Sequence, residues 1–343
     1  MSNLINETMM QYFEWNLPCD GTFWKEICRE ANLLSSIGIT AVWLPPAYKS
    51  TKGMQDTGYG VYDLYDLGEF NQKGCIPTKY GTKDEYIEAI KVLRANYIKV
   101  YADVVLNHRL GADETEDVIA YEQDPNNRTK NLTNPINIKA WTKYTFPGRG
   151  NVYSDFKWNW THFSGVDWDE NTKRSSVFQF YGKHWDNQVD KEKGNFDYLM
   201  GADVDLNNVD VVKELISWGK WYLSTTNVDG FRLDAIKHID ASFFEEWVKE
   251  LRDFSGKPLT VFGEYWSNNI DALNNYIKET KSEISLFDVP LHYNFFKASF
   301  SNGEYDLRTI FDGTLVKEHP ELAITFVDNH DTEPRSIIRV LDS

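Results

Sequence analysis

The sequence lacks the features that direct a chain into a membrane, onto nucleic acid or out of the cell. It has no run of about 18 apolar residues, so no transmembrane helix is expected. It has no stripe of basic residues, and its formal net charge is −16, which argues against a nucleic-acid partner. Its first residues show no basic start followed by an apolar run, so no secretory signal is visible and a cytoplasmic location is expected.

Cysteine is also scarce. Cys19, Cys28 and Cys75 are odd in number, and their spacing matches no metal or redox motif. We expect them to be small buried or partly buried side chains in a reducing compartment. The chain contains no internal repeat and no low-complexity linker.

Aromatic residues, in contrast, are abundant, with 12 Trp and 19 Tyr among 343 residues. Flat rings with a polar tip suit the apolar faces of sugars, but they also simply fill cores, and composition alone favours the core. The acidic balance suits solubility, a bound divalent cation or a neutral substrate equally well. With 41% hydrophobic and 26% charged residues, the composition is that of a globular protein.

Short β-branched and aromatic runs alternate with segments whose apolar residues recur at three- and four-residue spacing. This alternation predicts parallel βαβ units, and seven strands in such a rhythm favour a (β/α) barrel over an open sheet. The predicted strands lie near 9–15, 39–44, 98–106, 228–234, 260–266, 285–291 and 322–328.

Two features interrupt the barrel pattern. A polar stretch rich in Gly, Asn and Trp, about 109–207, is too long for a normal connection and is expected to form an inserted subdomain of short strands and loops. The barrel would then consist of 1–108 and 208–343. An eight-stranded barrel needs one more strand and helix after the seventh, and we find neither, so either the pattern hides them or the barrel is incomplete.

Acidic residues fall at the ends of four predicted strands. In a parallel barrel these ends meet at one face, where barrel enzymes carry out their chemistry. Together with His108 and His330, so many carboxylates around one mouth would be electrostatically costly unless a cation or a reaction used them. The four acids are Asp103, Asp234, Glu264 and Asp331.

The stretch "VDGFRLDAIKH" (228–238) places Arg232 and Asp234 two residues apart, on the same face of a strand. Taken alone, the pair is a structural salt bridge. Beside the other strand-end acids it suits a nucleophile, because the guanidinium would keep the carboxylate ionised and oriented. Glu264 precedes Tyr265 and Trp266, a drier setting that would raise its pKa, as a general acid requires. Two carboxylates in these roles are the machinery of glycoside hydrolysis.

Four segments resemble, in order, the signature regions of the α-amylase family of glycoside hydrolases. Further stretches, such as "MMQYFEW" and "FDYLMGADVDLNN", resemble the bacterial liquefying and cytoplasmic α-amylases, and the resemblance covers nearly the whole chain. It implies a (β/α)8 TIM-type barrel with a loop-rich β subdomain inserted after strand 3. The last barrel strand and helix and a C-terminal β-sandwich would be missing. The four segments are "DVVLNH" (103–108), "GFRLDAIKH" (230–238), "GEYW" (263–266) and "FVDNHD" (326–331).

The resemblance implies endo-acting, retaining hydrolysis of α-1,4-glucosidic bonds in starch, glycogen and maltooligosaccharides. Asp234 would be the nucleophile, Glu264 the acid/base, and Asp331 the group that stabilises the oxocarbenium-like transition state. A retaining mechanism places the first two carboxylates ~5 Å apart. Tyr59 would be a stacking platform, although an aromatic residue stabilising a turn is the alternative. The implied substrate-binding residues are Tyr59, His108, Arg232, His330, Lys237, His238 and Trp266.

The resemblance also implies a Ca²⁺ ion between the inserted subdomain and the barrel. Hard oxygen ligands suit this ion, although the aspartates alone could equally be helix caps and loop formers. A second metal site is doubtful, because Ser164 and Asn207 stand where the family pattern prefers Asp. The implied ligands are Asn107, Asp197, Asp203 and the backbone carbonyl of His238, with Asp186 and Asp205 for the second site.

Two other functions fit the same motifs. A relative could transfer glucosyl chains or release a maltooligosaccharide of fixed length, because the same three acids serve all these reactions. A truncated, inactive chain could instead bind α-glucan without turnover. The three catalytic positions all carry the expected acid, which favours the enzyme. The oligomeric state stays open.

Overall fold

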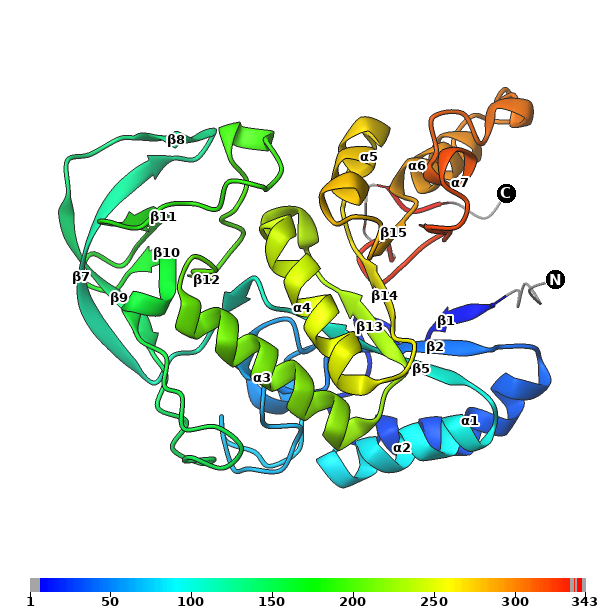
Figure 1. The fold of residues 1–343 in the computed structure, drawn as a ribbon, viewed down its shortest axis with the longest axis horizontal. Helices are drawn as coiled ribbons and strands as arrows, with labels where there is room; N and C mark the ends of the chain where they lie inside the picture. The colour runs from blue at the N-terminus through cyan, green and yellow to red at the C-terminus, as the bar shows by residue number, and fades with distance from the viewer. Residues whose placement is uncertain (1–6, 334–335, 337, 341–343) are drawn as a thin grey trace.

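The computed structural model describes residues 7–333, 336 and 338–340. Its centre is a seven-stranded parallel sheet that curls into part of a barrel, in the order β1-β2-β5-β13-β14-β15-β16 (Figure 1). All seven predicted strands are confirmed, each shorter than its apolar run. They are β1 (Met9–Gln11), β2 (Ala41–Leu44), β5 (Lys99–Val104), β13 (Gly230–Leu233), β14 (Thr260–Gly263), β15 (Ser285–Phe287) and β16 (Ala323–Ile324).

Helices follow the strands and cover the outside of the sheet (Figure 1). Each buries one apolar stripe, as Trp24, Ile27 and Leu34 do on the first helix, because residues at three- and four-residue spacing share a face. The α-helices are α1 (Phe23–Ser36), α2 (Lys83–Ala95), α3 (Val209–Thr226), α4 (Ala241–Ser255), α5 (Ile270–Glu279), α6 (Val289–Ser299) and α7 (Leu315–Glu318). Short 3-10 helices are η1 (Gly53–Gln55), η2 (Trp160–His162), η3 (Glu192–Gly194), η4 (Ile236–His238) and η5 (Leu307–Thr309).

The inner face of the curled sheet carries its own apolar cluster, separate from the larger core between sheet and helices. Trp43, Tyr101, Phe262 and Phe287 pack there edge to face or tilted, with ring centroids 5.4 to 5.5 Å apart. Aromatic side chains therefore fill the interior, and the polar chemistry is confined to the carboxyl ends of the strands.

The second sheet is antiparallel, in the order β6-β12-β10-β11-β7-β8, with β9 also pairing with β7. It lies at the side of the molecule opposite β1 and α7 (Figure 1). With 11 residues, β7 is longer than the short strands expected in this part of the chain. The strands are β6 (His108–Arg109), β7 (Glu114–Asp124), β8 (Asn127–Asn131), β9 (Ile136–Lys143), β10 (Phe163–Asp169), β11 (Arg174–Phe180) and β12 (Ala202–Val204); a separate pair is β3 (Lys49–Ser50) and β4 (Val61–Asp63).

The pairing of β6 with β12 connects the second sheet to the curled sheet. β6 follows β5 after only three residues, and β12 pairs with it so that Asp203 stands opposite His108. The amide of Val204 also donates to the carbonyl of Asn107 at 3.0 Å. Asn107 and Asp203, which are 96 positions apart in the chain, are therefore brought together at the mouth of the curled sheet.

β1 and β16 form the two edges of the curled sheet, and no strand in the described part of the chain lies between them. The segment after β16 nevertheless returns to β1. The amide of His330 donates to Oε1 of Gln11 at 3.2 Å, and the amide of Trp15 donates to the carboxylate of Glu333 at 3.2 Å. These contacts hold Asp331 at the mouth.

The three cysteines are free and half-buried, as expected. Within the described residues, no helix is both long enough and apolar enough to cross a membrane.

Candidate active site

The acids predicted to meet at the strand ends do so. Asp234 directly follows β13, Glu264 directly follows β14, and Asp331 follows β16 by seven residues. All three line one cavity of about 300 Å³. The rest of its lining is Trp15, Tyr59, His108, Leu199, Met200, Ala235, Lys237, His238, Trp266 and His330, so every predicted catalytic and substrate-binding residue lies there except Arg232, which lies beneath it.

Arg232 is fully buried and contacts three carboxylates at once. Its Nη1 lies 3.0 and 3.1 Å from the two oxygens of Asp103 and 2.5 Å from Oδ1 of Asp234. Its Nη2 lies 2.7 Å from Oε2 of Glu264. One guanidinium therefore orients the predicted nucleophile and the predicted acid/base together, which a rigid planar fork does better than a lysine.

The protonation of Glu264 suits a general acid. Burial raises its pKa to about 8; the charge of Arg232 opposes this shift, and the charges of Asp234 and Asp331 add to it. The amide of Ala235 also donates to its Oε2 at 3.3 Å. Burial likewise raises the pKa of Asp331, again opposed by Arg232. Glu264 thus holds a proton at neutral pH, ready for donation.

Beneath these residues, Asp103 is fully enclosed and accepts from Nε1 of Trp43 and the hydroxyl of Tyr59, both at 2.9 Å. Burial raises its pKa to about 7, against the charge of Arg232. Asp103 touches no open part of the cavity, so its contribution is to hold Arg232 and Tyr59 in place.

Three flat rings lie nearly parallel to one another along one wall, with every pair of centroids 5.1 to 6.1 Å apart. Tyr59 and His330 lie 5.1 Å apart at 7°, and Trp15 lies 5.8 Å from Tyr59 at 10°. Burial lowers the pKa values of both His330 and His108, so both imidazoles are neutral near pH 7. Nε2 of His108 lies 2.9 Å from the carbonyl of Tyr59, and this hydrogen bond holds the backbone of Tyr59 in place.

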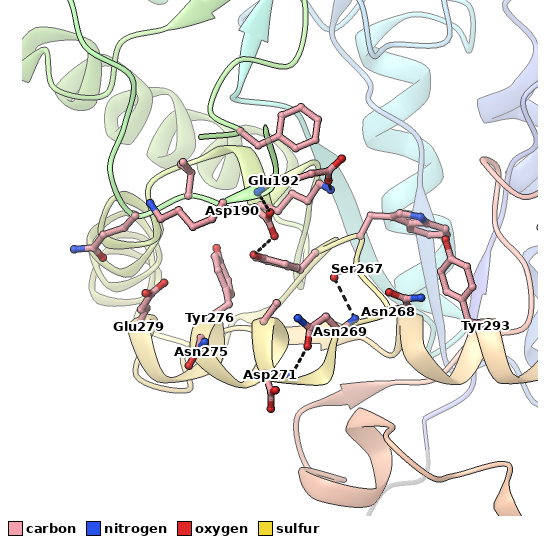
Figure 2. A pocket seen from close by; sticks show the side chains of 18 residues that line it. Asp190, Glu192, Ser267, Asn268, Asn269, Asp271, Asn275, Tyr276, Glu279 and Tyr293 are labelled. Carbon is pink, nitrogen blue, oxygen red and sulfur yellow. Dashed lines mark hydrogen bonds and ion pairs between the residues drawn. The ribbon is translucent and has the colours of Figure 1, made fainter. Parts of the chain in front are cut away.

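This cavity shares two lining residues, Lys237 and Trp266, with a second pocket of about 830 Å³. Figure 2 shows Asp190 and Glu192 on one side of this pocket and α5, with Tyr276 and Glu279, on the other. Nζ of Lys237 pairs with Oε2 of Glu192 at 3.1 Å. The predicted catalytic acids therefore lie beside a second, larger pocket with a mainly polar lining.

The residues predicted to bind calcium lie at the junction of the two sheets. Asn107, Asp197 and Asp203 are all buried, and Oδ2 of Asp203 has no hydrogen-bond partner among the residues that the structure describes. Burial, reinforced by the neighbouring carboxylates, raises the pKa values of Asp197 and Asp203 well above the ordinary value. Nδ1 of the buried His238 bonds to the carbonyl of Phe196 at 2.6 Å, which fixes the segment that bears its own carbonyl.

This donor set fits a hard cation. An unpartnered buried carboxylate oxygen is costly unless a positive charge reaches it, and carboxylate, amide and carbonyl oxygens are the ligands of Ca²⁺. Within the described residues, no three His, Cys, Asp or Glu side chains form a metal-binding group. The predicted set contains only two such side chains, with an amide oxygen and a backbone carbonyl as the others.

The two aspartates of the doubtful second site are already engaged. Asp205 pairs with Nζ of Lys183 at 2.5 Å, and Asp186 accepts from Nδ2 of Asn207 at 2.8 Å. The hydroxyl of Ser164 is buried and finds no hydrogen-bond partner in the described part of the chain. These residues therefore do not offer a second set of free cation ligands.

Sequence reasoning gave no role to several residues of the cavity. Trp15 lines the cavity, whereas Gln11 lies next to it and contacts His330; both belong to "MMQYFEW", a stretch that resembles the family but whose side chains have no predicted role. Leu199 and Met200 lie in a polar loop with no periodic pattern, so no local signal marked them. Asp103 was recognised as a strand-end acid, but its contact with Arg232 depends on strand register.

Polar residues at the carboxyl ends of parallel strands, with an apolar interior beneath them, define a barrel-type enzyme site. The family model described as "Alpha amylase, catalytic domain" matches residues 20–342, and the chain belongs to this family. An α-amylase of Geobacillus stearothermophilus is 59% identical over 96% of this chain and 60% of its own length. A cytoplasmic α-amylase of Escherichia coli is 45% identical over 96% of this chain and 67% of its own length.

Solved structures show the same fold. The crystal structure of an α-amylase from Geobacillus thermoleovorans, complexed with acarbose, matches with a TM-score of 0.60 at 22% identity. The match covers 94% of this chain and 61% of that one. The chain thus spans about three-fifths of the length of the G. stearothermophilus relative and of this solved structure.

Proposed function

We propose that the chain is the catalytic part of an endo-acting, retaining α-amylase. Its substrates would be the internal α-1,4-glucosidic bonds of starch, glycogen and maltooligosaccharides. The observation that carries the proposal is the contact of one buried guanidinium, Arg232, with both Asp234 and Glu264 in the same cavity. The two relatives named as α-amylases support it.

In the first step, Glu264 gives its proton to the glycosidic oxygen while a carboxylate oxygen of Asp234 attacks the anomeric carbon. The leaving chain departs with the proton, and a covalent glycosyl ester remains on Asp234. In the second step, Glu264 takes a proton from water, which attacks the same carbon and frees Asp234. A retaining pair needs carboxylates only ~5 Å apart, and the two terminal nitrogens of a single guanidinium favour so short a separation.

Asp331 would stabilise the positive charge that develops on the sugar ring and hold its hydroxyls. Tyr59 would stack on the sugar at the cleavage position, with His108 and His330 donating or accepting beside it. Lys237, His238 and Trp266 would contact the leaving-group side, where the cleft widens. Each role assigns a polar or flat side chain to a sugar surface of matching chemistry.

The calcium proposal rests on the fit of Asn107, Asp197, Asp203 and the carbonyl of His238. When bound, the ion would supply structural charge compensation and no reaction step. It would tie the proposed inserted subdomain, 109–207, to the loop after β13 that begins with Asp234. A cytoplasmic location is also proposed, and the cytoplasmic relative from E. coli supports it.

The test is hydrolysis of a blocked maltoheptaoside by the purified chain in calcium, beside an Asp234→Asn control. We expect turnover that falls about 10⁴-fold or more in the control, because removing a nucleophile removes the covalent route. Product length and the ratio of transfer to hydrolysis separate a maltooligosaccharide-forming enzyme or a transferase from an α-amylase. A folded chain that binds the oligosaccharide without turnover would instead be an α-glucan-binding fragment.

A further inference from the structure

We propose that the Lys183 ammonium is a built-in cation that takes the place of a second metal ion beside the proposed calcium site. The inference rests on the proposed calcium and concerns the acids that surround it. It predicts that the chain holds one calcium ion at this junction and that Lys183 neutralises the carboxylate beyond it.

The contacts of Lys183 are those of a bound cation. Its Nζ lies 2.5 Å from Oδ2 of Asp205 and 2.6 Å from the carbonyl of Thr161. The side chain of Asp205 is 6% exposed and that of Lys183 is 20% exposed. A carboxylate and a backbone carbonyl are also typical oxygen ligands of a hard metal ion. The ammonium therefore uses donors that a metal would need.

Asn207 also takes over part of the role of a metal ion, on the side of Asp186. Its amide nitrogen donates to Oδ1 of Asp186 at 2.8 Å, and its backbone amide donates to Oδ1 of Asp205 at 3.1 Å. An aspartate at this position would repel Asp186 instead of donating to it. Ser164, the other departure from the family pattern, adds a neutral hydroxyl where a further carboxylate was expected. Both departures lower the negative charge, as a site without a second metal requires.

The charges at the junction agree with a single calcium ion. The buried carboxylates there are Asp186, Asp197, Asp203 and Asp205. One Ca²⁺, the ammonium of Lys183 and the guanidinium of Arg128, whose charge acts on Asp203, would balance four negative charges. Asp240 also faces Asp186, but it caps α4 by accepting from the amide of Ser242 at 2.9 Å, and the helix N-terminus stabilises it. A second divalent ion would leave a buried excess of positive charge.

A second ion would not be kept out by lack of access. A pocket of about 690 Å³ is lined by Lys183, Asp205 and Asn207, so an ion could approach these residues. The positive charge already present must then be what keeps a second metal ion from binding. Substituting a few side chains alters that charge.

The first experiment measures bound calcium by equilibrium dialysis after chelator treatment, and the melting temperature with chelator or with calcium. We expect about one ion per chain. We also expect Lys183→Met to lower the melting temperature by about 5 °C or more in both conditions, because it leaves a buried carboxylate unpaired. The matched control is Lys130→Met, an exposed lysine 3.9 Å from Asp124, which should change it by about 1 °C or less.

The second experiment rebuilds the metal site. In Lys183→Met/Asn207→Asp, and in the same variant with Ser164→Asp added, we expect bound calcium to rise from one to two ions per chain and calcium to restore most of the lost stability. Two ions in the unmodified chain, no loss of stability in Lys183→Met, or one ion in both rebuilt variants would overturn the proposal. A chain that binds no calcium would overturn the primary site, and Lys183→Met in chelator would still decide the role of Lys183.

Discussion

Arg232 and Asp103 stand opposite each other on neighbouring strands, and the guanidinium donates to both carboxylate oxygens at 3.0 and 3.1 Å. The parallel register of β13 and β5 produces this pair, because it aligns Gly230 with Tyr101 two residues earlier. A Cβ on Gly230 would lie only 1.9 Å from the carbonyl oxygen of Thr260, so glycine permits the close approach of β14 on the other side. Strand pairing thus places Arg232, and through it the proposed catalytic acids, from below.

Replacing Asp103 by Asn should impair catalysis although Asp103 touches no substrate. Arg232 would lose its fixed partner and shift towards Asp234 and Glu264, so we expect kcat to fall about 10²-fold with little change in KM. Steady-state kinetics on the blocked maltoheptaoside measures this. The control is Asp66→Asn, which removes another buried carboxylate, 3.4 Å from Lys49 and away from the cavity. Equal kinetic losses in both variants would show a general loss of stability and contradict the positioning role.

Replacing Glu264 by Gln should remove activity and leave the fold intact. The amide oxygen can still accept from Nη2 of Arg232, but no proton is available for the leaving group, so we expect a loss of about 10²- to 10⁴-fold. In the unmodified chain, kcat/KM should decline as the pH rises through about 8, the pKa of Glu264. A basic limb that stays flat to pH 9 would contradict the assignment of Glu264 as the acid.

The same carboxyl group should make stability depend on pH. Its pKa in the folded chain is about 8, above the ordinary value of 4.5, so the folded state binds the proton more tightly than the unfolded state. This contribution is complete below pH 4.5 and is lost as the pH rises through 8. Glu264→Gln keeps a neutral side chain at every pH. The melting temperature of this variant, relative to that of the unmodified chain, should therefore rise between pH 5 and pH 9. A constant difference would contradict the buried, protonated state.

The sequence predicted the strands and the strand-end acids because both are local patterns. Runs of β-branched and aromatic residues indicate a buried strand whichever strand it pairs with. An acid that follows such a run lies at the strand end in any pairing. Strand length was overestimated: 322–328 pairs with β15 only at Ala323 and Ile324, because the ladder depends on a neighbour that the pattern does not contain.

Long-range contacts could not be predicted in this way. The amide of His330 donates to Gln11, 319 positions away, and no local pattern around either residue predicts this contact. Lys183 lies in a polar loop without periodicity, where one lysine resembles any solvated charge. Its pairing with Asp205 depends on the pairing of β12 with β6, the strand that follows β5. That strand pairing exists only in the folded chain.

Calcium removal should reverse the effect of one substitution. In chelator, Asp203→Asn should raise the melting temperature, because it removes a buried carboxylate oxygen that lacks a partner. In calcium it should lower the melting temperature relative to the unmodified chain, because a ligand is lost. Asp169→Asn is the control: Asp169 is buried in the second sheet, and its carboxylate accepts from the amides of Lys139 and Asn171. It should lower the melting temperature equally in both conditions, and the same sign for Asp203→Asn in both would contradict the calcium site.

Two substitutions of Tyr59 should separate its stacking from its hydrogen bond. Tyr59→Phe keeps the ring beside His330 but removes the hydroxyl that donates to Asp103 at 2.9 Å, so we expect kcat/KM to fall less than about 10-fold. Tyr59→Ala also removes the platform on which the sugar would stack, and we expect a fall of about 10²-fold. Melting temperatures and steady-state kinetics of both variants provide the comparison. If the two variants lose the same kcat/KM, the hydroxyl and not the ring is the functional part. If Tyr59→Ala loses stability but keeps its kinetic constants, Tyr59 supports the turn and does not bind the sugar.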